Sequence, residues 1–201
     1  MIIVEHQLPL PTEKLVRAYI RIFEDTPDYV ITDRALFKLF GLFPRNDSLD
    51  EVLLKATTLN SLYGTNILAI YTVAEHIYSC NIDDKIHNFD MSIVEEIATI
   101  TIKGKVRRNY SFASKYCSFH YPEVYPVYDY FVDHLLWQYQ QRDGFSRFRR
   151  YELFQSYSTY KQVIEDFRDY YNLANLSLKE IDKFLWLCGK GFTGSQIEGL
   201  V

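Results

Sequence analysis

The stretch Tyr110–Asp129, YSFASKYCSFHYPEVYPVYD, places many titratable side chains in a short span, one residue after the basic run KGKVRR. The candidates for catalysis are the carboxylate of Asp129, the amine of Lys115 and the imidazole of His120. A carboxylate in a cleft can stabilise positive charge or accept a proton, a desolvated lysine can act as a nucleophile, and a histidine can relay a proton. Each residue also has a structural interpretation: a helix cap, a solvated or salt-bridged lysine, and a histidine favoured by a helix dipole.

Two prolines fix the backbone around these side chains. Pro122 forbids continuation of a helix beyond about His120, and Pro126 directly precedes a second helix expected from about Val127 to Gln140. Asp129 should therefore lie in or beside the first turn of that helix, where backbone amides are unpaired and the helix dipole is positive. The sequence predicts a helix–turn–helix corner that presents this carboxylate.

Two basic clusters are candidates for contacts with nucleic-acid phosphates. The first consists of Lys103, Gly104, Lys105, Arg107 and Arg108, and its glycine would let backbone amides approach a strand. The second consists of Arg142, Arg147, Arg149 and Arg150, interleaved with two phenylalanines. Guanidinium groups suit bidentate contacts with phosphate. A solvated helix terminus explains the first cluster equally simply.

Aromatic residues make up 16% of the chain and surround the corner. We expect Tyr110, Tyr121 and Tyr125 to be candidates for stacking on an extruded base, because every base offers a π-face. Packing in the core or in a protein interface is the alternative role for these rings.

Composition and charge limit the class of protein. The 201 residues suit one domain, and the net charge of −4 means that nucleic-acid affinity would depend on a local basic patch. Three separated cysteines without metal-type spacing indicate free thiols and a cytoplasmic location. The N-terminal run, interrupted by Glu5 and His6, predicts neither a signal peptide nor a membrane anchor. Because nucleotide-loop, dinucleotide and zinc-protease motifs are missing, we expect no cofactor and no metal; the oligomeric state stays open.

Helical periodicity dominates the chain and predicts one all-α domain over residues 1–190, with an irregular segment 1–11 and a flexible tail 191–201. Helix starts are expected at Thr12 and Thr65 and at three S-x-x-E capping boxes: Ser48 with Glu51, Ser92 with Glu95, and Ser177 with Glu180. We expect the segment from Ser92 to Lys103 to be a helix that ends near Gly104, although its run IATITI also suits a strand.

The corner resembles the core of helix-hairpin-helix DNA glycosylases, and more closely the small bacterial proteins described as 8-oxoguanine DNA glycosylase-like. Their pattern S-K-x-L-x-F-x-x-P-x-x-x-P-I-x-D is matched by Ser114, Lys115, Phe119, Pro122, Pro126, Val127 and Asp129, with Cys117 at the leucine position. This resemblance implies a multi-helix bundle of the helix-hairpin-helix type that binds DNA and extrudes a damaged base into a cleft. It also implies that Asp129 is the key carboxylate.

The chain departs from that family in two places. The usual L-P-G-V-G-x-K hairpin is reduced to Gly104 and a basic run, and Asn109, Tyr110 and Ser111 stand near the position of the Schiff-base lysine. We therefore expect any glycosylase activity to use water, with Lys115 or His120 assisting Asp129, and we do not expect lyase activity.

Two functions of different classes follow. One is an N-glycosylase, and the other is a non-catalytic protein that kept the scaffold for binding nucleic acid or another protein. A base-sized cleft with Asp129 in its wall and basic residues at its rim would favour the enzyme.

Overall fold

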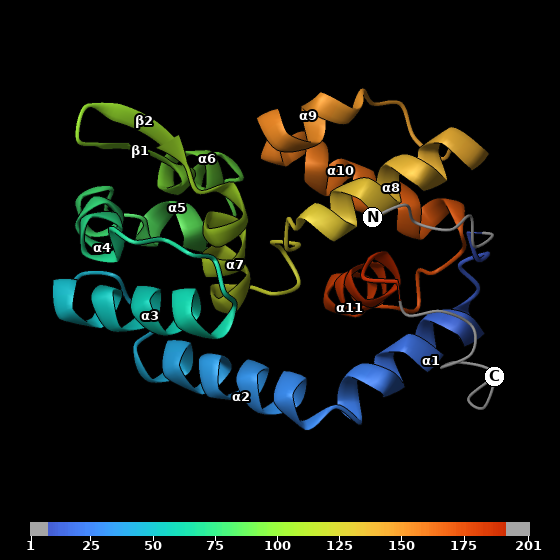
Figure 1. Cartoon of the computed structure of the whole chain (residues 1–201), viewed down its shortest axis with the longest axis horizontal. Coiled ribbons are helices and arrows are strands. Elements are labelled where there is room, and N and C mark those ends of the chain that lie inside the picture. The colour runs from blue at the N-terminus through green and yellow to red at the C-terminus, as the bar shows by residue number, and fades with distance from the viewer. Residues whose placement is uncertain (1–7, 192–201) are drawn as a thin grey trace.

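A computed structural model describes residues 8–191, and this part of the chain is mostly helical (Figure 1). In chain order its elements are α1 Glu13–Glu24, α2 Pro27–Leu42, α3 Leu49–Leu62, α4 Ile70–Ser79, α5 Asp83–His87, α6 Ser92–Ala98, β1 Thr99–Ile102, β2 Lys105–Arg108, α7 Tyr110–His120, α8 Tyr130–Asp143, α9 Arg150–Gln155, α10 Tyr157–Tyr170 and α11 Leu178–Gly189. Within these residues, no helix combines the length and the apolar character needed to cross a bilayer.

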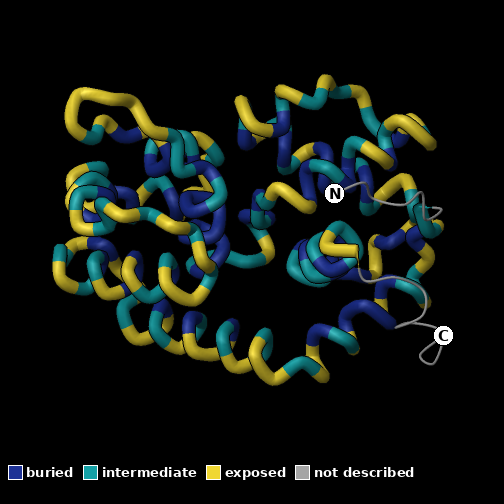
Figure 2. The backbone as a smooth tube through the Cα atoms, in the orientation of Figure 1, coloured by how far each residue is buried: buried dark blue, intermediate teal, exposed yellow. Residues whose placement is uncertain are grey.

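The helices form two groups that face each other (Figure 1). In one group α3 packs on α4 and α6 packs on α7; in the other α11 packs between α1 and α8. The consecutive helices α1 and α2 connect the groups along one edge, and α2 continues onto α3 and α7. Buried residues line the inward side of both groups (Figure 2). The segment that links α7 to α8 passes from one group to the other, so it lies where they meet.

A glycine brings α11 unusually close to α8. A Cβ atom on Gly189 would lie 2.6 Å from the backbone oxygen of Phe131, closer than real Cβ contacts allow. The absence of a side chain at this position therefore lets the end of α11 pack directly on the first turn of α8, which begins beside Asp129.

The prediction of a helix from Ser92 to Lys103 is wrong beyond Ala98. The chain instead forms an antiparallel hairpin, with Thr99 opposite Arg108 and Ile102 opposite Lys105. The β-branched run 99–102 favours extended backbone. Lys103 and Gly104 have φ values of 51° and 72°, as a two-residue hairpin turn requires. The basic run is therefore a turn and a strand, and the fold carries a small sheet that an all-α class does not include.

Two of the predicted helix starts are confirmed, and one predicted capping box is wrong. Thr12 caps α1 by accepting from the amide of Leu15, and Ser177 forms the predicted capping box with Glu180. Ser92 lies inside α6, so its predicted box is wrong.

Two further starts need correction. Ser48 stands at the N-cap of α3, but its hydroxyl binds Asp50 and makes no capping bond. Thr65 lies in the loop before α4, which begins at Ile70. Residues 8–12 precede the first helix, whereas segments 1–7 and 192–201, with most of the predicted flexible tail, lie outside the described residues.

Candidate functional site

The turn between α7 and α8 is fixed by side chains from α10 and α11. The amide of Val127 donates to Asp182 Oδ2 at 2.8 Å, and the carbonyl of Val127 accepts from the hydroxyl of Tyr160 at 2.6 Å. The carbonyl of Pro126 accepts from the hydroxyl of Tyr157, also at 2.6 Å. Buried backbone groups must be paired, and here three rigid helical side chains pair them. The turn is therefore held in one conformation.

The same turn sets the position of Asp129. The amide of Tyr128 donates to Ser114 Oγ at 3.0 Å, which ties the turn to α7. Asp129 is the N-cap of α8, and its Oδ1 accepts from the amide of Phe131 at 3.0 Å. The helix begins three residues later than predicted, but the corner with Asp129 at the N-terminus of the second helix is confirmed.

Lys115 lies beside Asp129 in the interior. Its Nζ is 3.4 Å from Asp129 Oδ2 and 2.5 Å from Ser111 Oγ, and its side chain is only 5% exposed. Burial lowers the pKa of the Lys115 ammonium, and the neighbouring carboxylate offsets only part of this effect. A larger fraction of Lys115 is therefore a neutral amine at physiological pH than for a lysine in water.

Two hollows meet at this pair. The α11 hollow, of about 320 Å³, is lined by aromatic rings, aspartates and lysines, and the hairpin hollow, of about 360 Å³, lies between the loop after α3, the end of β2 and α9. Lys115, Asp129 and Tyr63 line both. The amine and the carboxylate can therefore contact a molecule that occupies either hollow.

Asp182 also lines the α11 hollow. It is 5% exposed, and its Oδ1 has no hydrogen-bond partner within the described residues. Burial raises the pKa of this carboxyl to about 7, opposed by the Val127 amide and by the ammonium groups of Lys179 and Lys115. Sequence reasoning missed Asp182, although a carboxylate on the apolar side of an amphipathic helix was an available signal.

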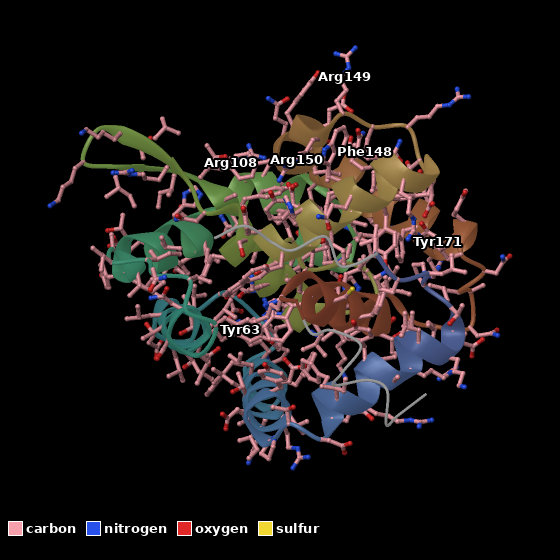
Figure 3. All side chains as sticks on the ribbon, turned by 45° about the vertical axis from the view of Figure 1, so that its right-hand side comes forward. Tyr63, Arg108, Phe148, Arg149, Arg150 and Tyr171 are labelled. Atoms are coloured by element: carbon pink, nitrogen blue, oxygen red, sulfur yellow. The ribbon has the colours of Figure 1, made fainter. Side chains whose placement is uncertain are left out.

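The end of the hairpin contacts α9. Arg108 donates to the carbonyls of Phe154 at 2.8 Å and Gln155 at 3.1 Å, and its guanidinium lies over the Tyr110 and Phe154 rings. Arg150 is the first residue of the same short helix, and Figure 3 shows Arg108, Arg149 and Arg150 toward one side of the molecule. The two predicted basic clusters therefore approach each other beside the hairpin hollow, which Arg108 lines.

The basic residues of these clusters differ in whether they are free to contact a ligand. Lys103, Gly104, Lys105, Arg107, Arg147 and Arg149 are exposed. Arg150 pairs with Asp133 at 3.1 Å. Arg142 pairs with Asp143 at 2.6 Å and also donates to the backbone carbonyl of Leu8, so it is occupied by the protein.

The three tyrosines predicted to stack on a base lie in three different environments. Tyr110 lines the hairpin hollow but is 1% exposed and lies against Arg108. Tyr121 is partly exposed and packs on Phe89, away from both sets of lining residues. The prediction for Tyr125 is wrong, because its ring is fully buried and its hydroxyl donates to the carbonyl of Asp90. Tyr63, which sequence reasoning did not select, lies between the hollows instead.

The prediction that His120 assists Asp129 is also wrong. His120 packs against the rings of Phe40 and Tyr116, and its Nε2 is 3.4 Å from the side-chain nitrogen of Asn46. It lines neither hollow. The cause is its position at the end of α7, where the helix has turned it toward α2.

His120 should make stability depend on pH. Burial, with a smaller contribution from the Lys55 charge, lowers its pKa from 6.5 to about 3. The unfolded chain then binds a proton near pH 6.5 and the folded chain does not. We expect the free energy of unfolding to fall between pH 6.5 and 3, with His120 contributing at most about 1.4 kcal/mol per pH unit.

Urea denaturation at several pH values between 7 and 4.5 tests this expectation. His120→Gln should lose stability less steeply than the wild type as the pH falls. His87→Gln, at an exposed histidine, is the matched control and should retain the wild-type slope. Equal slopes for wild type and His120→Gln would contradict the prediction.

Comparisons with known proteins match one family model and one curated relative. The family model HI_0787_N, described as an N-terminal domain, matches residues 15–124, from α1 through the end of α7. A protein of Haemophilus influenzae (strain ATCC 51907 / DSM 11121 / KW20 / Rd), described as "Uncharacterized protein", is 39% identical over 152 residues, which cover 75% of this chain and 72% of that protein. No solved structure matches. The chain therefore belongs to the HI_0787_N family.

Proposed function

We propose that this protein cleaves the N-glycosidic bond of a damaged nucleotide in DNA. The observation that carries the proposal is the pair of Lys115 and Asp129, an interior amine 3.4 Å from a helix-capping carboxylate at the boundary of two hollows. Sequence resemblance to DNA glycosylases supports the same assignment. Asp129 caps a helix, which both alternatives allow, but it also lines a cleft, which favours the enzyme.

In the proposed reaction the extruded base enters the α11 hollow and the sugar lies near the pair. The bond between C1′ and the base nitrogen breaks, and its electron pair leaves with the base. Asp129 stabilises the positive charge that develops on the sugar. A water molecule then adds its oxygen to C1′, and its proton passes to Asp129 or to Lys115 where that amine is unprotonated.

Lys115 has a second role within this proposal, as the nucleophile in place of the water. A buried amine beside a carboxylate is suited to attack C1′ as the bond to the base nitrogen breaks, which forms a carbon–nitrogen single bond. The C1′–O4′ bond then breaks with its electron pair on O4′, one nitrogen proton passes by way of Asp129 to O4′, and a Schiff base results. The position of Lys115 in the sequence argues against this route, whereas its lowered pKa favours it.

We assign the fold, as part of this proposal, to the helix-hairpin-helix glycosylase type. The β1–β2 hairpin directly precedes α7, the helix that carries Lys115. It therefore stands where the resemblance expects the strand-binding helical hairpin, and its exposed turn is basic.

Incubation with duplexes that contain 8-oxoguanine, uracil or alkylated bases tests the proposal. Release of base from at least one duplex, scored as alkali-labile abasic sites, is the expected result. Borohydride reduction during the reaction should trap a covalent protein–DNA adduct only if Lys115 is the nucleophile, and Lys115→Arg should then abolish the adduct. Binding without base release on every duplex would instead favour the non-catalytic alternative.

The exposed basic residues should govern the salt dependence of DNA binding. Arg107 and Arg149 are exposed and lie on the hairpin and at the N-cap of α9. If each contacts a phosphate, the double variant Arg107→Gln/Arg149→Gln should reduce the slope of log affinity against log salt by about 1.8, since each contact contributes about 0.9.

Fluorescence anisotropy with a labelled duplex at several salt concentrations measures this slope. The control removes two exposed charges from other helices, Lys14→Gln/Lys38→Gln, and should keep the wild-type slope. An unchanged slope in the arginine variant would remove this surface from the proposed interface.

A further inference from the structure

We propose that the α11 hollow is a binding site for a free nucleoside 5′-monophosphate, with the base inside and the phosphate at the lysines of α11. This inference goes beyond base excision and does not require that the protein cleave any bond. It rests on the loosely paired lysines, on the one oxygen of Asp182 that has no partner within the described residues, and on the aromatic walls of the hollow.

Four lysines line the hollow together with three aspartates, and the ion pairs that these lysines form are long. The nearest ion-pair distances are 3.4 Å for Lys115, 3.8 Å for Lys179 with Asp33, and 4.0 Å for Lys183 with Glu24. Charge-assisted hydrogen bonds are usually about 2.7–2.9 Å long. Elsewhere in the described chain, pairs such as Arg17–Glu13 close to 2.7 Å.

The fourth lysine is held by aromatic rings. Lys190 Nζ lies 4.1 Å from the Trp186 ring centroid and 5.6 Å from that of Tyr29, and it forms no salt bridge with the described residues. Lys183 likewise lies over Phe23, at 4.6 Å. An anion can therefore bind these ammonium groups without displacing a tight salt bridge.

A polar group inside the hollow lacks a partner. Asp182 is buried, its Oδ2 is satisfied by the Val127 amide, and its Oδ1 is unpaired within the described residues. An unpaired buried polar atom is costly unless a ligand or water binds it. After a small rotation of the Asp182 side chain toward the hollow, a nucleobase edge can supply an N–H donor to this oxygen, or an acceptor if the carboxyl is protonated.

The walls and size fit one nucleotide. Tyr29 and Trp186 meet edge to face at 5.1 Å and offer apolar surface to a planar ring. The volume of about 320 Å³ is at the lower end of ligand sites, which span about 300–1,000 Å³. A mononucleotide is therefore a better match than a dinucleotide cofactor.

Isothermal titration calorimetry with the full chain tests the inference. The ligands are the four common nucleoside 5′-monophosphates and 8-oxo-dGMP, their nucleosides, and phenyl phosphate. We expect at least one nucleotide to bind with a Kd of about 1 mM or tighter, and its nucleoside and phenyl phosphate to bind at least about tenfold more weakly. Equal affinity of nucleotide and nucleoside would refute the phosphate site, and equal affinity of nucleotide and phenyl phosphate would refute recognition of the base.

Two variants locate the site. Lys183→Ala/Lys190→Ala should weaken nucleotide binding at least about tenfold, whereas Lys14→Ala/Lys38→Ala, with the same change in net charge, should not. Asp182→Asn, which keeps the shape of the side chain, should change the preference among bases. Equal weakening by both lysine pairs would indicate nonspecific attraction and overturn the assignment.

Excision assays run in parallel separate the two proposals. Excision without nucleotide binding would refute this inference alone. Nucleotide binding without excision of any lesion would refute the proposed reaction and leave the binding site.

Discussion

Asp129→Asn is expected to lower the rate of base excision by about 10²–10⁴-fold, the range typical of a lost acid–base or charge-stabilising group. The substitution removes the negative charge that faces the developing positive charge on the sugar. It preserves the helix cap, because asparagine caps helices about as well as aspartate. The loss of rate should therefore appear in the chemical step, and any loss in the free energy of unfolding should come from the ion pair with buried Lys115 and not from the helix cap.

Single-turnover excision on the responsive duplex, with thermal melting of each variant, measures both effects. Asp169→Asn, at an exposed aspartate of α10, is the matched control and should react at the wild-type rate. Asp129→Ala should lose both activity and stability, since it removes the cap as well. A variant Asp129→Asn with wild-type single-turnover rates would refute the assigned role of the carboxylate.

The size of this effect depends on how firmly the carboxylate is placed. Tyr157, Tyr160 and Asp182 bind three consecutive polar groups of the turn that precedes Asp129. A charge that is already oriented need not reorganise during the reaction, so its stabilising effect is larger than that of a mobile side chain. Two of the three are core tyrosines whose apolar bodies pack while their hydroxyls fix the backbone.

Local rules were sufficient to predict the corner. Pro122 and Pro126 restrict their own backbone and that of the preceding residue, and a carboxylate after such a turn is a natural cap. These effects act within a few residues, so the sequence predicts them directly. The end of α7 at His120 and the capping role of Asp129 followed from them.

The rest of the site depends on contacts between distant residues. Asp182 is 53 positions after Asp129 and reaches the turn only because α11 packs on α8. Residues 92–103 carry both helical periodicity and a run of β-branched residues that favours a strand. The sequence alone did not show which of these signals prevails, so the β-hairpin was not predicted. His120 could face Asp129 or α2 with equal local justification, and tertiary packing turned it toward α2.

A second buried lysine, Lys55, likewise depends on contacts that local sequence rules do not predict. It leads to the largest expected effect on stability. Lys55 is fully buried, although lysines are usually exposed, and its Nζ donates to Asn46 Oδ1 at 2.7 Å and to the carbonyls of Phe43 and Arg45. Burial lowers the pKa of Lys55 to about 8, and Asp83 is the largest of the charges that oppose this.

Asn46 links this network. Its Oδ1 also accepts from the Tyr116 hydroxyl at 2.6 Å, and its side-chain nitrogen Nδ2 donates to the Asp83 carboxylate at 2.7 Å. Asn46→Ala removes these three side-chain bonds and the 3.4 Å contact with His120 Nε2, and it leaves a buried charge and a buried hydroxyl each short of a partner. We expect a loss of about 3 kcal/mol in the free energy of unfolding.

Urea denaturation at pH 7 measures this loss, with Asn88→Ala at an exposed asparagine as the control. The network also predicts that the effects of substitutions at Asn46 and Lys55 are not additive. Lys55→Met removes the buried charge that Asn46 serves, so the double variant Asn46→Ala/Lys55→Met should be destabilised by less than the sum of the single variants. Strict additivity would mean that the two side chains stabilise the loop between α2 and α3 independently, which contradicts the contact between them.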